Sequence, residues 1–121
     1  MKIDVEQEHD VCIVRLSGHL VTGTDPVFLQ AKADEVRYRC GKILVDMREL
    51  ASIGSTGIGF LLGIYATTSK NPRGRFVVVG PQPRVQQIFE ITRLNGILRI
   101  VPDLASGLAV LGEAEAAAGG R

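Results

Sequence analysis

The sequence contains few cysteines, and none has the spacing of a metal site or a redox motif. Cys12 and Cys40 are the only two, no CxxC pair occurs, and each lies among apolar neighbours. Clustered cysteines indicate metal sites or disulfide frameworks, whereas an isolated Cys in an apolar context behaves as a small core residue. We therefore interpret both as reduced packing residues, and we expect neither a metal nor a cofactor.

An excess of charge of one sign is also lacking. Fourteen Lys and Arg residues face thirteen Asp and Glu residues, which leaves a net charge of +1. A nearly neutral chain has no general electrostatic attraction to nucleic acid or to an acidic membrane surface. We expect no direct contact with nucleic acid.

Long hydrophobic runs are missing as well. The first residues, "MKIDVEQEHDV", place charges between single apolar residues, so they do not form the continuous apolar core of a secretory signal. No later stretch approaches the length of a membrane-spanning helix. The sequence predicts a cytoplasmic protein without membrane insertion.

The length of 121 residues, with 45% hydrophobic and 22% charged residues, fits one compact globular domain. We place this domain at residues 1–111. Leu111 is the last large apolar residue that could anchor the chain. The residues after it, 112–121 or "GEAEAAAGGR", therefore predict a frayed C-terminal tail.

Strands are predicted from short β-rich or continuously apolar runs that end at glycine or charged residues. The runs "KILVD" and "RFVVVG" are typical of strands buried on both faces of a parallel sheet. The predicted strands cover residues 2–8, 11–18, 42–46, 75–80 and 98–101.

Helices are predicted from apolar spacing of three and four residues and from their start and stop signals. Asp25-Pro26 starts the first helix, whose face is Leu29, Ala33, Val36 and Cys40; the second has the face Ile58, Leu61, Leu62 and Tyr65. Pro83 starts the third, with Val85, Ile88, Phe89 and Thr92 on one face and a left-handed exit at Asn95-Gly96. Asp103 caps the fourth, with Leu104, Leu108 and Leu111 on one side.

Together these elements predict an α/β fold in the order β-β-α-β-α-β-α-β-α. Helices that connect parallel strands cover the faces of the sheet they join. We therefore expect a mixed, mostly parallel sheet of about five strands with about four helices.

A polar, glycine-rich stretch, Gly54-Ser55-Thr56-Gly57, lies where the second helix begins; we call it the GSTG segment. The start of a helix has unpaired backbone donors and a positive dipole end, which favour an oxygen acceptor or an anion. Ser55 could be a plain N-cap, or it could be exposed for phosphorylation or partner recognition. Further along this helix, Gly59 and Gly63 would let its backbone pack close to another element.

Catalytic motifs fit this segment poorly. It lacks the Lys and spacing of a P-loop, and it forms neither GxGxxG nor GxSxG. His9 and His19 have no evident acid or metal partner in the sequence, and we interpret them as solvated or structural. We expect a protein that is not an enzyme.

The order of these pieces resembles the STAS domain, and within it the small bacterial anti-sigma factor antagonists. The resemblance rests on "VCIVRLSGHLVTGTDPVFL", "KILVDMRELASIGSTGIGFLLG" and "RFVVVGPQPRVQQIFEITRLNGILRIVPDLASGLAVL". The family motif is a strand that ends in Asp, a short loop, and a Ser/Thr segment that ends in Gly at a helix start. Asp46 and Ser55-Thr56-Gly57 occupy those places.

The resemblance implies regulation by partner exchange. The unphosphorylated antagonist would bind an anti-sigma factor that is also a serine kinase of the histidine-kinase-like ATPase type, and so release a sigma factor. Phosphorylation of Ser55, or of Thr56 as the alternative, would end that binding, and a serine phosphatase would be a further partner. The implied partner surface is Val21, Thr22, Gly23, Thr24, Gly54, Ser55, Thr56, Gly57 and Ile58.

Two stretches of the sequence depart from the family pattern. Gly54 stands where an acidic residue often precedes the phosphorylated Ser, and "GHLV" has His19 for Glu and Val21 for Asp. Other classes therefore stay open: a STAS scaffold or accessory subunit of a signalling or lipid-transport assembly that binds without a phosphorylation switch, then a nucleotide or small-molecule sensor, and last a serine hydrolase.

Overall fold

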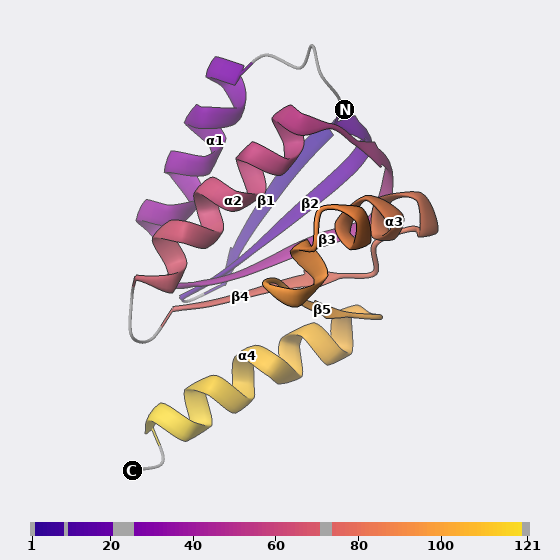
Figure 1. Ribbon diagram of the computed structural model, residues 1–121. Coiled ribbons are helices and arrows are strands. Elements are labelled where there is room, and N and C mark those ends of the chain that lie inside the picture. Colours follow the sequence, from indigo (N-terminus) through magenta and orange to yellow (C-terminus); the bar gives the residue numbers. More distant parts are fainter. Residues whose placement is uncertain (1, 9, 21–25, 71–73, 120–121) are drawn as a thin grey trace.

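The computed structural model describes residues 2–8, 10–20, 26–70 and 74–119. Its element order is β1(Lys2–Glu8), β2(Val11–Leu20), α1(Pro26–Arg39), β3(Lys42–Ile53), α2(Ser55–Ser69), β4(Arg75–Val79), α3(Pro83–Ile91), β5(Arg99–Val101) and α4(Leu104–Gly119), with the short 3-10 helix η1(Leu94–Gly96) before β5 (Figure 1). This confirms the predicted α/β fold and its order of strands and helices.

The five strands form one sheet in the order β1-β2-β3-β4-β5, so each strand lies next to its neighbour in the sequence. β1 pairs antiparallel with β2, whereas β2, β3, β4 and β5 are mutually parallel. Parallel neighbours need a crossover, and here each crossover contains a helix. The sheet is therefore mixed and mostly parallel, as the sequence predicts.

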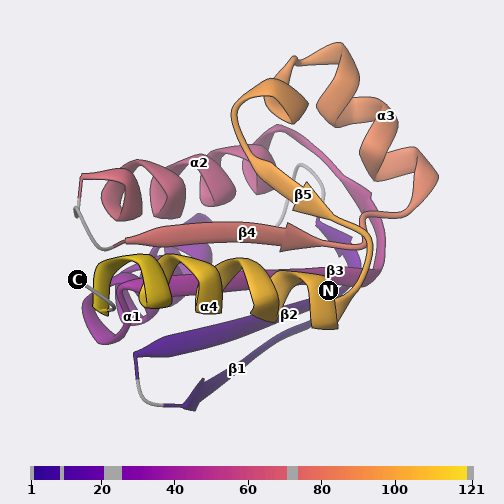
Figure 2. The same ribbon diagram turned by 90° about the horizontal axis from the view of Figure 1, so that it is seen from below.

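Helices cover both faces of the sheet (Figures 1 and 2). The larger core lies on the side of α1, α2 and α3 and includes Val14, Leu61 and Phe89. The smaller core lies beneath α4 and includes Leu44, Val77 and Leu111. Since α1 and α2 lie side by side, begin at the same end of the sheet and run in the same direction, their first turns face the same edge of the molecule.

β3 is longer than its apolar run predicts. The sequence places the end of this strand at Asp46, but the strand continues to Ile53 because β2 pairs with it as far as Leu20↔Ile53, past two register shifts. Met47 and Leu50 are fully buried in the extension. The prediction that Asp46 ends the strand is wrong. Pairing with β2 extends the strand through the charged residues Arg48 and Glu49.

The buried face of α2 is not the one that the sequence predicts. Gly57, Phe60, Leu61, Ile64 and Thr68 are buried, and the predicted face shares only Leu61 with this set. Leu61 is fully buried, and Ile58, Leu62 and Tyr65 pack against the larger core. The role predicted for Gly59 and Gly63 is wrong, because a Cβ placed on either glycine would have no atom within 4 Å. Both glycines lie on the exposed side of the helix.

The exit of α3 differs from its prediction. Val85 and Phe89 are fully buried, but Thr92 is exposed and donates its hydroxyl to the Ile88 carbonyl at 2.7 Å. The left-handed residue is Arg93, with φ 62°, and not Asn95-Gly96, which lies in η1. The chain reverses one turn earlier than the glycine suggests.

α4 contacts the sheet through a different residue from the one predicted. Leu111 is buried and Leu104 packs on the smaller core, but Leu108 is 43% exposed. The close contact is Gly107, where a Cβ would lie 2.7 Å from Val79 Cγ2 and 2.9 Å from Leu44 Cδ1. α4 remains helical to Gly119, beyond the predicted start of the tail, and the boundary of the domain at residue 111 stays a prediction.

Cys12 and Cys40 are joined in a disulfide. This contradicts the interpretation that both are reduced packing residues, although both are buried in the larger core as expected. The sequence offers no pairing signal because the two residues are separated by 28 positions, and only the packing of α1 brings their Cα atoms to 5.8 Å.

Candidate functional site

The GSTG segment forms the first turn of α2. Gly54 is the N-cap, in an extended conformation, and its carbonyl accepts the N–H of Ile58 at 3.0 Å. Ser55 is the first residue of the helix, one position after the N-cap. The interpretation of Ser55 as a plain N-cap is therefore wrong, because Gly54 occupies that position.

The residues of this first turn differ in exposure. Ser55 is exposed, Thr56 is half-buried and Gly57 is buried. Ser55 is therefore the more accessible of the two hydroxyl residues. The N–H groups of a helix's first turn precede its intrahelical hydrogen bonds, and together with the helix dipole they favour an anion at this end.

The exposed side of α2 carries only small residues near its start. Ser55, Gly59, Gly63 and Ala66 are all exposed, and they follow one another at the spacing of a single helix face. No charged residue occurs between Ser55 and Ser69. The result is a smooth, uncharged face that a partner can approach closely.

The end of β2 lies beside the GSTG segment. His19 pairs with Ser52, and Leu20 pairs with Ile53, immediately before Gly54. His19, one of the departures from the family pattern, therefore lies in β2 next to the GSTG segment. The predicted contact residues Val21, Thr22, Gly23 and Thr24 lie outside the described residues.

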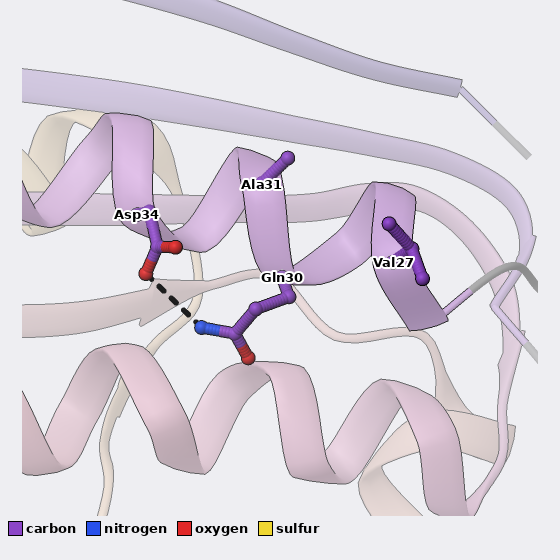
Figure 3. A pocket seen from close by; sticks show the side chains of 4 residues that line it. All are labelled: Val27, Gln30, Ala31 and Asp34. Carbon is purple, nitrogen blue, oxygen red and sulfur yellow. Dashed lines mark hydrogen bonds between the residues drawn. The ribbon is translucent and has the colours of Figure 1, made fainter.

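α1 adds a second exposed surface at the same end of the molecule. Val27 is 75% exposed and Phe28 is 43% exposed. A concave patch behind Val27 is lined by Gln30, Ala31 and Asp34, and the Gln30 amide donates to the Asp34 carboxylate at 3.0 Å (Figure 3). In this view the Gln30 side chain extends toward α2.

Asp46 is part of an ion-pair network that the sequence did not predict. Its carboxylate accepts the Arg48 Nε–H at 2.9 Å, the Arg48 Nη2–H at 2.8 Å and the Arg48 backbone N–H at 3.1 Å. Arg15 Nε lies 3.7 Å from the same carboxylate. Burial by itself raises the pKa of Asp46, but the hydrogen bonds and charge of Arg48, with the charge of Arg15, outweigh it and hold that pKa below its ordinary value.

Arg48 also connects the ion-pair network to the residues that follow β4. The stem of Arg48 lies over Gly80, where φ is 60° and a Cβ would meet Arg48 Cγ at 2.6 Å. The Arg48 carbonyl accepts the Gln82 amide at 2.9 Å, which ties β3 to the start of α3. The spacing Asp46-x-Arg48 on one side of a strand is the signal that could have found the pair.

Asp46 and Ser55 are not brought together. Arg15 shares its sheet face with Val11 and Ile13, which pack on the smaller core beneath α4, and Asp46 points to that face. Ser55 begins a helix on the opposite side. The two motif positions therefore serve different parts of the fold.

Among the described residues no group of three or more His, Cys, Asp or Glu side chains could hold a metal ion. No helix in that part of the chain is long and apolar enough to cross a membrane.

Comparisons with known proteins agree with this architecture. The family model described as the STAS domain matches residues 2–107. The chain belongs to the STAS domain family. It is similar to a protein of Paenibacillus polymyxa named anti-sigma F factor antagonist, with 31% identity over 105 residues that cover 84% of this chain and 86% of the relative.

Solved structures of anti-sigma factor antagonists share the fold. An anti-sigma factor antagonist from Mycobacterium paratuberculosis has a TM-score of 0.76 and 25% identity, covering 91% of this chain and 92% of its own. The unphosphorylated form of the anti-sigma factor antagonist SpoIIAA has a TM-score of 0.73 and 19% identity, covering 92% and 97%. At 19% identity that second likeness shows the fold alone.

Proposed function

We propose that this STAS protein is an anti-sigma factor antagonist whose binding is controlled by phosphorylation of Ser55. In this role it binds an anti-sigma factor that is also a serine kinase of the histidine-kinase-like ATPase type, and it thereby releases a sigma factor. The observation that carries the proposal is that Ser55 is an exposed residue at the first position of α2. The relative named anti-sigma F factor antagonist supports it.

The electrostatics of α2 suit a charge switch. A phosphoryl group adds a charge of about −1.5 to −2. The helix start tolerates that charge, because its dipole and its leading N–H groups favour anions. On an uncharged face of small residues, the same charge is the dominant local feature, so a partner that packs on this face would be repelled or left with an unpaired charge.

The proposed contact surface has three parts: the GSTG segment with Ile58, the exposed face of α2, and residues Val21 to Thr24. Phosphorylation occurs at Ser55, and Thr56 is disfavoured because its side chain is half-buried. A serine phosphatase would restore the binding form. The protein itself performs no reaction in this cycle, and its partners place it in the cytoplasm.

The test compares four tagged proteins in pull-downs from the native host: the parent, Ser55→Ala, Ser55→Asp and the matched control Ser69→Asp. Ser69 is exposed at the far end of α2, so the control adds the same charge away from the site. We expect the parent, Ser55→Ala and Ser69→Asp to retain a protein with a histidine-kinase-like ATPase domain, and Ser55→Asp to lose it.

A phosphorylation assay completes this test. The retained kinase with ATP should add one phosphoryl group to the parent and none to Ser55→Ala, as read by intact mass and peptide mapping. Equal retention by Ser55→Asp, together with no phosphorylation, would contradict the proposal. That outcome would support the alternative, a scaffold or accessory subunit that binds its partner without a phosphorylation switch. Gly54, which stands in place of an acidic residue, is the observation that favours this alternative.

A further inference from the structure

The Cys12–Cys40 disulfide joins β2 to the residue that follows α1. Cys12 lies in β2 and is fully buried, and Cys40 follows the last residue of α1 and is 6% exposed. The bond therefore fixes the end of α1 to the central part of the sheet. No thiol is left over in the described residues.

The side chains that the structure describes as buried in α1 are small. Its closest backbone neighbour is α2 and not a strand. Besides Cys40, the described side chains that it buries fully are Ala33 and Val36, both small. Hydrophobic stabilisation scales with buried apolar area, so small side chains anchor a helix weakly. Among the described contacts of α1, the covalent bond is accordingly a major attachment to the sheet.

The two sulfur positions would stay close after reduction. Asp10, which precedes β2, accepts the N–H of Gly41 on its side chain at 2.9 Å and the N–H of Lys42 on its carbonyl at 3.1 Å. Cys12 also pairs with Ile43 in the β2–β3 ladder. These bonds hold the segment after Cys40 beside the strand that carries Cys12, so a reduced pair remains placed to form the bond again.

A disulfide is unusual in the compartment that the proposed function implies. Cytosolic thiols are kept reduced, and disulfides that form there are mostly transient and regulatory. The cytosolic compartment follows from the proposed function, whereas the small buried side chains of α1 and the retained proximity of the cysteines do not.

We propose that Cys12–Cys40 is a reversible redox latch: oxidation locks α1 onto the sheet beside α2, and reduction by a dithiol releases it. A thiolate of the dithiol attacks Sγ of Cys40, the more exposed partner, and the bond to Cys12 breaks. Cys12 leaves as a thiolate and takes a proton from water.

The second thiol of the reductant then closes on the mixed disulfide and frees Cys40. The dithiol becomes a disulfide, and the protein gains two electrons and two protons. Oxidised glutathione, a disulfide oxidant, reverses the exchange through the corresponding mixed disulfide.

Hydrogen exchange measured by mass spectrometry tests the latch without any partner protein. We expect dithiothreitol to raise exchange in residues 26–39 by about tenfold or more, because local opening of α1 becomes easier, while β3 and β4 keep their protection. Treatment with oxidised glutathione should restore the slow exchange. The Cys12→Ser, Cys40→Ser double variant should match the reduced parent in every buffer.

Alkylation of the thiols reports the covalent state in the same samples. Two alkylated cysteines after dithiothreitol and none after oxidised glutathione are expected. Cysteines that oxidised glutathione cannot join, or equal exchange of α1 in both states, would overturn the latch. Either result is independent of Ser55, so the failure of this proposal is distinguishable from the failure of the proposed function.

Discussion

Replacing Gly107 by alanine tests how closely α4 packs on the sheet. The added Cβ would lie 2.7 Å from Val79 Cγ2 and 2.9 Å from Leu44 Cδ1, whereas carbon atoms in favourable contact are about 3.5–4.0 Å apart. Both neighbours are fully buried, and the β-branched side chain of Val79 has little rotational freedom. α4 must therefore move outward, or the strands must yield.

Two opposing terms set the size of the effect. Overpacking in a well-filled core costs about 1–3 kcal/mol, and exchanging glycine for alanine inside a helix returns about 1 kcal/mol. We expect Gly107→Ala to lower the free energy of unfolding by up to about 2 kcal/mol. The matched control is Gly63→Ala in α2, where a Cβ would meet nothing within 4 Å, so the same exchange should stabilise the protein by about 0.5–1 kcal/mol.

Urea unfolding of the oxidised protein, followed by circular dichroism, measures both variants. The midpoints should move in opposite directions while the slope of free energy against urea stays constant. A Gly107→Ala protein as stable as Gly63→Ala would refute the reasoning, because it would mean that α4 can move away from β3 and β4 without cost.

Two further substitutions test single features of the fold. Asp46→Asn should cost about 1–3 kcal/mol at neutral pH, since it removes the charge that binds Arg48. Because the folded state lowers the pKa of Asp46, this contribution is full above the ordinary Asp pKa of about 4 and is lost as pH falls through the lower folded value. The difference from the parent in urea midpoint should shrink in acid, and a difference that does not change with pH would show that the charge plays no part. Arg93→Gly should raise the free energy of unfolding by up to about 1 kcal/mol, since its φ of 62° strains a side chain. The control is Gln87→Gly at an exposed position within α3, which should lower the free energy of unfolding by about as much. Thermal unfolding measures both variants, and a change of the same sign in Arg93→Gly and Gln87→Gly would contradict the prediction.

The uncharged face of α2 links the fold to the proposed switch. A helix that packs one apolar side on the sheet commonly carries charged residues on the other side. Here the outer positions are Ser55, Gly59, Gly63 and Ala66, which add neither charge nor bulk. Such a face costs helix stability through its glycines, and contact with a partner gives a physical reason for the residues found there.

The sequence by itself determined the order of the elements, because the signals that set it are local. Short apolar runs bounded by glycine or charge identified β3 and β4, and Pro83 and the GSTG segment marked two helix starts. The position of Ser55 at the beginning of α2 also followed from the sequence, since the glycines and the apolar spacing after them lie within a few residues.

Only the tertiary structure decided the features that depend on distant residues. β3 runs to Ile53 because β2 pairs with it, and Cys12 meets Cys40 because α1 folds back over the sheet. Gly107, and not Leu108, faces the strands. The side of α4 that contacts the sheet depends on the position and direction in which the chain leaves β5. Periodicity states which residues share a face, and the packing of the whole chain selects the face that is buried.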